Sequence, residues 1–273
     1  MTHSDSLLER IAAALERSLP ATTGAPDWLS HPAYVWESGN VRAVAALMAP
    51  ELGLMQGIDA QKQAVVENVA RLASGAAAHD MLLWGARGMG KSALLRAAVR
   101  NVQQQHPASI ALVQATPDAG LAALLRELRE IDRQFLVFLD DLGFDSASSD
   151  EPRRLRSWLE GGVEARPDNV RLAVTSNRRA IVDRHLSEQD DPINPRDAID
   201  DRLALADRFG LSLGFHNCSQ DDYLAIVAGY AAHHGLAWTE TEALGWAKRR
   251  GARSGRVAWQ FITELAGRAG QRL

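Results

Sequence analysis

The strongest chemical pattern in the sequence is the run Gly85-Ala86-Arg87-Gly88-Met89-Gly90-Lys91-Ser92. It fits G-x-x-x-x-G-K-[ST], which is typical of a loop that binds phosphate groups. Glycines let the backbone bring its N–H groups up to an anion, and a helix that starts after the loop adds partial positive charge. In such a loop Lys91 would reach the β- and γ-phosphates of a nucleotide, and the Ser92 hydroxyl would ligate Mg2+.

Two adjacent carboxylates form the second candidate site. Asp140 and Asp141 directly follow the apolar run at 135–139, which has the composition of a buried strand. Beside a phosphate-binding loop, the acid at the end of such a strand holds Mg2+ and the next acid orients the attacking water. We therefore predict Asp140 as the metal-side acid and Asp141 as the base. Asp141 is one methylene shorter than the usual glutamate, so Asp145 and Glu160 are kept as alternative bases.

Three further polar residues follow in positions where they could contact a phosphate. Asn177 follows the apolar run at 170–175, Arg208 precedes another at 209–215, and Arg256 starts the last helical pattern. An amide at a strand tip can hold the attacking water or contact the γ-phosphate. Each residue also has a simpler interpretation, as part of a strand-ending turn or as an exposed charge at a helix end.

The pattern of apolar segments predicts the scaffold that positions these residues. Runs typical of buried strands lie at 81–84, 109–115, 135–139, 170–175 and 209–215. Helical patterns accompany them at 60–73, 91–105, 118–131 and 151–165, the first of them with Asp59 as the expected N-cap. This alternation predicts an α/β fold, with a five-stranded parallel sheet and helices on both faces.

The two ends of the chain differ from this core. Residues 7–19 and 41–49 have helical spacing, 20–26 resemble a linker, and 27–36 carry three aromatic residues. That aromatic segment either packs onto the core or docks a partner. Helical patterns at 221–234, 240–250 and 255–268 predict a C-terminal lid. We therefore expect an N-terminal helical and aromatic segment (1–50), a nucleotide-binding core (51–216) and a helical lid (217–273).

Composition excludes several classes of protein. The 273 residues are 46% hydrophobic and 23% charged, as in globular domains. A net charge of −4 argues against a globally basic nucleic-acid binder, although it allows a local basic patch. The single cysteine, Cys218, rules out an internal disulfide. We see no apolar run of membrane-spanning length and no signal peptide, and we predict a cytoplasmic protein.

The order of these elements resembles that of the AAA+ ATPases from about residue 52 to residue 265. More narrowly, the chain resembles a bacterial AAA+ family labelled only as a domain of unknown function. The similar phrases are Leu82–Gly88, Asp140–Leu142, Leu159–Gly162, Thr175–Arg179 and Ser254–Phe261. The narrower family also has Asp-Asp-Leu, so Asp141 in place of glutamate need not mean inactivity.

The resemblance implies roles for individual residues, with ATP and Mg2+ as cofactors. Ser92 and Asp140 would hold the metal, Asn177 would be the first sensor and Arg256 the second. Arg208 resembles the arginine finger, which reaches the γ-phosphate of a neighbouring subunit. Ile58 would line the adenine pocket, and the nucleotide would contact Gly85, Ala86, Arg87, Gly88, Met89, Gly90, Lys91, Ser92 and Ala93.

These roles predict a Mg2+-dependent ATPase that forms a homo-oligomer through Arg208 and remodels or loads a macromolecular partner. Asp141 motivates an alternative, a slow or non-hydrolysing module that ATP switches. A GTPase is disfavoured because no Asn-Lys-x-Asp segment, which would read guanine, follows the fourth strand. A small-molecule kinase is disfavoured because the helical lid is at the C-terminus rather than inside the core. The partner is unknown, and residues 178–198 and the aromatic segment are its candidate contacts.

A basic group in the lid motivates a third, less favoured alternative, a DNA-linked loader. The simpler interpretation, which we favour over the loader, is that part of the group binds ATP and part forms a solvated face. Its members are Lys248, Arg249, Arg250, Arg253, Arg256 and Arg268.

Overall fold

A computed structural model describes residues 27–37, 39–116, 118, 120–142, 167–177 and 207–273. Several sequence-based predictions lie outside these residues. They are the helices at 7–19 and 151–165, the linker at 20–26, the segment 178–198, and the alternative bases Asp145 and Glu160.

One sheet organises the described residues, with the strand order β2-β1-β4-β5-β6-β3-β7. The five predicted strands are all present, adjacent and parallel. Two strands that the sequence did not predict extend the sheet beyond β4. The strands are β1 (Ala33–Glu37), β2 (Asn40–Val44), β3 (Met81–Gly85), β4 (Ile110–Ala115), β5 (Gln134–Leu139), β6 (Val170–Ser176) and β7 (Leu211–Phe215).

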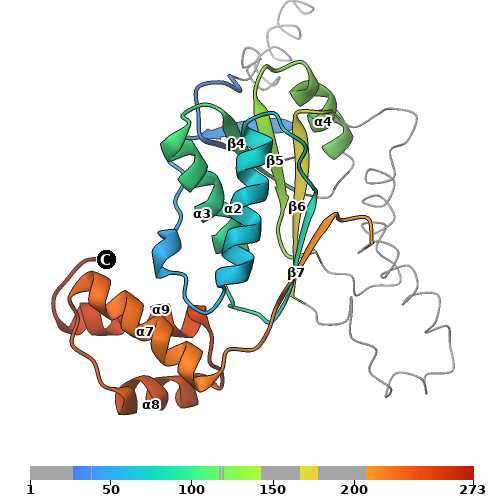
Figure 1. The fold of residues 1–273 in the computed structure, drawn as a ribbon. Helices are drawn as coiled ribbons and strands as arrows, with labels where there is room; N and C mark the ends of the chain where they lie inside the picture. The colour runs from blue at the N-terminus through green and yellow to red at the C-terminus, as the bar shows by residue number, and fades with distance from the viewer. Residues whose placement is uncertain (1–26, 38, 117, 119, 143–166, 178–206) are drawn as a thin grey trace, which may run out of the picture.

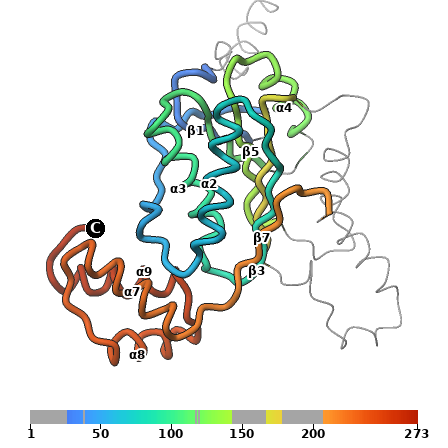
Figure 2. The backbone as a smooth tube through the Cα atoms, viewed as in Figure 1, coloured from blue at the N-terminus to red at the C-terminus, as the bar shows by residue number. Residues whose placement is uncertain are grey.

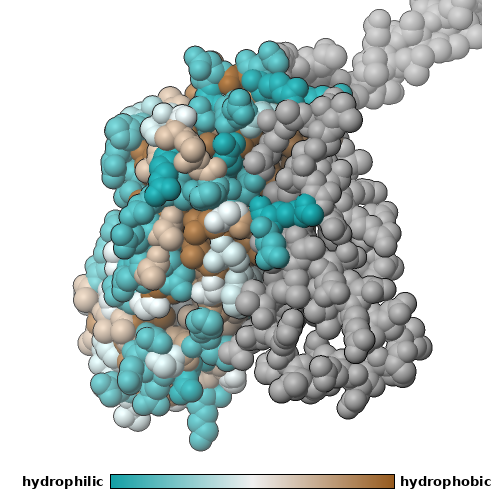
Figure 3. Space-filling model, turned by 45° about the vertical axis from the view of Figure 1, so that its right-hand side comes forward, coloured by the Kyte–Doolittle hydropathy of each residue, from teal (hydrophilic) through white to brown (hydrophobic). Residues whose placement is uncertain are grey.

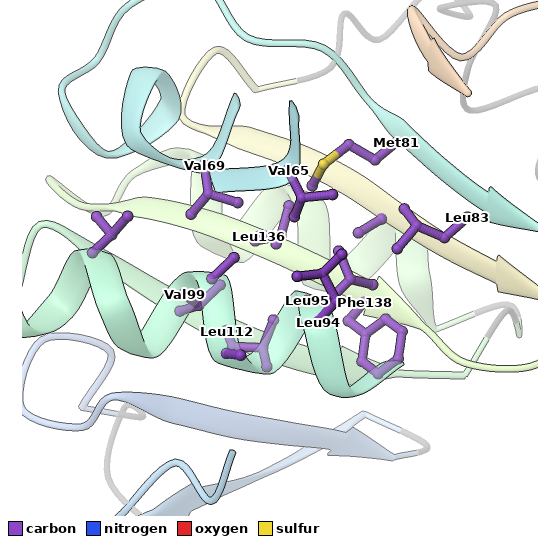
Figure 4. Close-up of a cluster of buried hydrophobic side chains, with 14 of the residues drawn as sticks. Val65, Val69, Met81, Leu83, Leu94, Leu95, Val99, Leu112, Leu136 and Phe138 are labelled. Carbon is purple, nitrogen blue, oxygen red and sulfur yellow. The ribbon is translucent and has the colours of Figure 1, made fainter. Parts of the chain in front are cut away.

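Helices cover both faces of this sheet, which is why its central strands are almost wholly apolar. Helices α2 (Asp59–Ala73) and α3 (Lys91–Gln105) lie on one face, and α4 (Leu121–Arg129) lies on the other (Figure 1). Side chains alternate between the faces along each strand. In β5, Leu136 and Phe138 point towards α2 and α3, as Figure 4 shows, whereas Val137 packs on the α4 side.

The prediction of a helix at 41–49 was wrong, because this stretch begins with strand β2. Gly39, at φ +84°, lies in a two-residue connection that turns β1 back into antiparallel β2. Primed hairpin turns of this length need positive φ, which glycine adopts without strain. Strand β1 also pairs in parallel with β4, and its side chains Tyr34 and Trp36 are buried. The aromatic segment is therefore part of the core.

The start of α2 also differs from the prediction. Asp59 is the first helical residue rather than the N-cap, which is Ile58 and makes no side-chain cap bond. Asp59 instead pairs with Lys62, at 2.6 Å between Oδ1 and Nζ. A carboxylate in the first turn stabilises the helix through its dipole.

The C-terminal lid is a three-helix unit with its own hydrophobic core. It consists of α7 (Gln220–His234), α8 (Glu240–Arg250) and α9 (Gly255–Arg268), close to the predicted bounds. Each helix begins with a hydroxyl N-cap, from Ser219, Thr239 and Ser254 respectively. Figure 2 shows the lid gathered at one end of the sheet, near β3 and β7, where the strand-ending loops can reach it.

Candidate functional site

The loop between β3 and α3 has the conformation that its sequence pattern predicts. Gly85, Gly88 and Gly90 have φ values of +117°, +76° and +87°, in the region that favours glycine. Helix α3 then begins at Lys91, so the N-terminal N–H groups of the helix face the loop. The loop and the helix together form a site for an anion.

Lys91 lies in the centre of this site, with only 5% of its surface exposed. Its ammonium donates to the carbonyl oxygens of Gly85 and Ala86, each at 2.9 Å, and to Oδ1 of Asn177 at 3.1 Å. All three of its N–H donors therefore have an acceptor. Burial lowers the pKa of Lys91 from its ordinary value, while Asp141 and Asp140 oppose that effect.

The predicted metal-side pair is in direct contact. The Ser92 hydroxyl donates to Oδ1 of Asp140 at 2.7 Å. The hydroxyl of Thr175, which is buried in β6, donates to the same oxygen at 2.7 Å and accepts from the Asp141 N–H at 2.9 Å. Thr175 thus fixes both acidic residues at once, a role that the sequence did not predict.

Asp141 has an unusual backbone, because its φ of +53° is rare for a non-glycine residue. The Thr175 hydroxyl holds its N–H, and the Asn177 amide donates to its carboxylate. The Arg87 guanidinium also lies 3.8 Å from Oδ2 of Asp141, with both side chains more than half exposed. Asn177 therefore bridges Lys91 and Asp141, the predicted phosphate ligand and the predicted base.

The lid contacts the phosphate-binding loop at Gly88. The Arg256 N–H donates to the carbonyl oxygen of Gly88 at 3.1 Å. A Cβ atom added to Gly88 would lie 2.9 Å from the Ser254 hydroxyl oxygen. This close approach brings Arg256, the predicted second sensor, to the edge of the site.

A cavity of about 720 Å3 lies between the core and the lid. This volume is within the usual range of about 300–1,000 Å3 for small-molecule sites. Ile58 and residues of the 48–56 segment line one side, and α7 and α9 contribute Tyr230, His234 and Trp259 to the other. The predicted residues that line the cavity are Ile58, Gly88, Met89, Gly90, Lys91, Ser92, Ala93, Asp140, Asp141, Asn177 and Arg256.

Four predicted site residues do not line the cavity: Gly85, Ala86 and Arg87, which belong to the first half of the phosphate-binding loop, and Arg208. Arg208 is the one that the fold keeps apart from that loop. It precedes β7, whose first residue, Leu211, pairs with Met81 at the start of β3, whereas the phosphate-binding loop follows the end of β3. About 13 Å of strand separates these two edges of the sheet. Arg208 is not among the described residues that line the cavity.

The aromatic wall of the cavity is a feature that the sequence reading missed. The ring centroids of Tyr230 and Trp259 lie 5.1 Å apart, and those of His234 and Trp259 lie 5.9 Å apart. These residues occupy separate helices, α7 and α9, so no local motif joins them. Tyr230 and His234 are four residues apart and therefore share one face of α7, which was the available signal, whereas Trp259 in α9 gave none.

Gly85→Ala should destabilise the fold by about 3 kcal/mol or more, because the new Cβ would be strained and crowded. That atom would lie 2.2 Å from the carbonyl oxygen of Phe215, at a φ of +117°. Urea unfolding at unchanged m-value measures the loss. Gly267→Ala is the matched control, since nothing lies within 4 Å of that position in α9. An unchanged midpoint for Gly85→Ala would contradict the assigned loop geometry.

One known protein family has a sequence pattern that matches this chain. The family described as "Protein of unknown function (DUF815)" matches residues 29–269. A search of the curated proteins found no match. Among the described residues, no helix is long and apolar enough to cross a membrane.

Solved structures with a similar fold include two DNA-related proteins. The Thermotoga maritima RuvB Holliday junction branch migration motor is 17% identical, with a TM-score of 0.52, over 82% of this chain and 68% of its own. The Aeropyrum pernix Orc1 protein, in complex with DNA, is 15% identical, with a TM-score of 0.58, over 83% of this chain and 66% of its own. At these identities the likeness shows the fold alone.

Proposed function

Because the chain belongs to the DUF815 family and has the AAA+ fold, we propose that it is a Mg2+-dependent ATPase that acts as a homo-oligomer. In this proposal its nucleotide state drives the remodelling or loading of a macromolecular partner. The proposal includes a cytoplasmic location, in keeping with the single cysteine.

The observation that carries the proposal is the 2.7 Å hydrogen bond from the Ser92 hydroxyl to Asp140. It joins two oxygen groups that would suit a phosphate-bound Mg2+, one from the first turn of α3 and one from the residue that follows β5. Carboxylate and hydroxyl oxygens suit Mg2+, which binds few protein ligands beside phosphates and water. The donor set therefore fits a nucleotide-bound metal, whose chemistry would be to neutralise charge on the phosphates.

The chain's own residues supply the rest of the proposed chemistry. Gly88, Gly90 and Lys91 line the cavity and would bind the phosphates, and Arg256 would approach them from the lid. Ile58 and the aromatic wall would hold the base. Asn177 and Asp141, which contact each other, would orient the attacking water.

Oligomerisation enters the proposal through Arg208. The fold keeps this residue away from the cavity of its own subunit. A neighbouring subunit could bring its Arg208 to that cavity and stabilise charge on the transferred phosphoryl group. Activity per subunit should therefore rise with protein concentration.

A second function has a specific observation in its favour. The Asp141 side chain is one methylene shorter than that of glutamate, and its carboxylate already accepts from Asn177 and lies near Arg87, so fewer of its lone pairs are open to an attacking water. A module that binds ATP and hydrolyses it slowly or not at all is the corresponding proposal. ATP would then order the lid over the core and change a binding surface.

Steady-state ATP hydrolysis against protein concentration, with a Lys91→Ala blank, separates these functions. A rate per subunit that rises with concentration supports the oligomeric ATPase. ATP binding with no rate above the blank, at every concentration, supports the switched module. Absence of ATP binding contradicts both.

Thr175→Val should reduce hydrolysis about tenfold to a hundredfold, because the Asp141 N–H and Asp140 both lose the Thr175 hydroxyl. The Mg2+ concentration for half-maximal rate should rise, whereas ATP binding without Mg2+ should change little. Thr175→Ser keeps the hydroxyl and should remain close to the wild type. Equal losses for both variants would show that Thr175 matters only for packing.

A further inference from the structure

The structure divides the six members of the basic group named above into separate sets, and a seventh basic residue of the lid, Arg272, lies exposed after the end of α9. Arg256 lines the cavity, and Arg268 pairs with Glu264 at 2.9 Å and with Glu242 at 3.8 Å. The remaining four are exposed, and none makes an ion pair with a carboxylate of the described residues. We call these four the lid basic surface: Lys248, Arg249, Arg250 and Arg253.

Two cations of the lid basic surface are held in place by one aromatic ring. The guanidinium carbons of Arg250 and Arg249 lie 4.8 Å and 5.7 Å from the centroid of the Trp246 ring. Trp246 is anchored in turn, with its ring 6.0 Å from that of Phe261 in the lid core. This stacking orders the two guanidinium groups beforehand, which lowers the entropic cost of binding an anion.

Within α8 the acidic residues lie at the opposite end from the lid basic surface, while the charges of Asp222 in α7 and of Arg253 both act on Cys218. The lid basic surface occupies the last turn of α8 and the loop that follows, whereas Glu240 and Glu242 are in the first turn. About 15 Å of helix separates the two ends. The helix C-terminus adds only about half a negative charge, which four cations outweigh.

Its place in the fold also leaves it open to a large ligand. Helix α8 lies at the end of the lid farthest from the sheet (Figure 1), and that end of the molecule is predominantly hydrophilic in Figure 3. None of the exposed large hydrophobic side chains of the described residues belongs to α8. The surface therefore offers charge without the apolar groups that membrane insertion requires.

We propose that the lid basic surface binds the phosphate backbone of a nucleic acid without reading its sequence. Arginine presents forked donors that match phosphate oxygens, and the guanidinium groups of Arg249 and Arg250 both contact the Trp246 ring. Evenly repeated phosphates offer an anion to each of these four exposed cations, whereas a protein surface presents its carboxylates at irregular spacing. The inference goes beyond the proposed function by naming the class of partner, and it does not depend on hydrolysis.

The test is anisotropy titration of a fluorescent DNA, single-stranded and duplex, without nucleotide and over a series of salt concentrations. Four contacts predict a slope of log K against log salt of about −3 to −4. Replacing Arg249 and Arg250 by glutamine should weaken binding about tenfold or more and reduce the slope by about 1.5 to 2. Lys91→Ala should bind DNA as the wild type does, which separates this test from the ATPase proposal.

The matched control replaces Arg71 and Arg126 by glutamine, which removes the same charge from exposed positions on α2 and α4. It should bind DNA within about twofold of the wild type. An equal loss for both double variants would show diffuse attraction and overturn the proposal. No binding at low salt, or competition by polyglutamate as strong as by unlabelled DNA, would overturn it too.

Discussion

Lys91→Ala is expected to lower ATP hydrolysis by about a hundredfold to a thousandfold or more, the effect of losing a donor aimed at developing charge. ATP binding should weaken as well, because Lys91 is a buried cation of the cavity wall. Isothermal titration and steady-state turnover measure the two effects separately. Hydrolysis by Lys91→Ala at the wild-type rate would contradict the assignment of this cavity as the ATP site.

Two further variants show whether that loss comes from the missing charge. Lys91→Met keeps the length and the apolar stem of the side chain but removes all three donors, so it should lose activity while remaining folded. Lys62→Ala removes a lysine that pairs with Asp59 on α2, outside the cavity, and should stay active. Thermal unfolding of each variant identifies any loss that is merely structural.

Arg208→Ala is expected to lower turnover by about a thousandfold or more, as expected for an arginine finger. ATP affinity should stay within about twofold, because Arg208 does not line the cavity of its own subunit. The wild-type rate per subunit should rise with concentration, and the variant should remain slow throughout. Arg126→Ala, an exposed change on α4, is the control for loss of a surface arginine.

Mixing the two inactive variants tests the contribution in trans directly. Lys91→Ala keeps Arg208, and Arg208→Ala keeps the phosphate-binding loop, so a mixed oligomer contains complete sites at their shared boundaries. Mixed samples should recover activity that neither variant has alone. Failure to recover activity in verified mixed oligomers, or wild-type turnover by Arg208→Ala, would contradict action in trans.

The sequence alone predicted the structure correctly wherever residues close together in the chain determine it. The helices at 91–105, 240–250 and 255–268 have the predicted bounds. The apolar spacing of all three, the hydroxyl caps of the last two and Gly251 are signals that lie within a few residues of the helices they define. The phosphate-binding loop was equally local, because its glycines and Lys91 form one continuous pattern.

The spacing of apolar residues was misleading where pairing between strands decides the structure. Val41, Val44 and Leu47 are spaced as on a helix, yet residues 40–44 form an edge strand because β1 is there to pair with them. Strand β1 pairs in turn with β4, which lies far away along the chain. Strand formation depends on such partners more than helix formation does.

Only the tertiary structure decided how the site residues contact each other. Thr175 reaches Asp140 and Asp141 because β5 and β6 are neighbours, a fact that no local spacing contains. The separation of Arg268 from the lid basic surface likewise depends on Glu242, from another helix. Sequence specifies residue types and local backbone, whereas contacts between distant residues exist only once the strands and helices have packed.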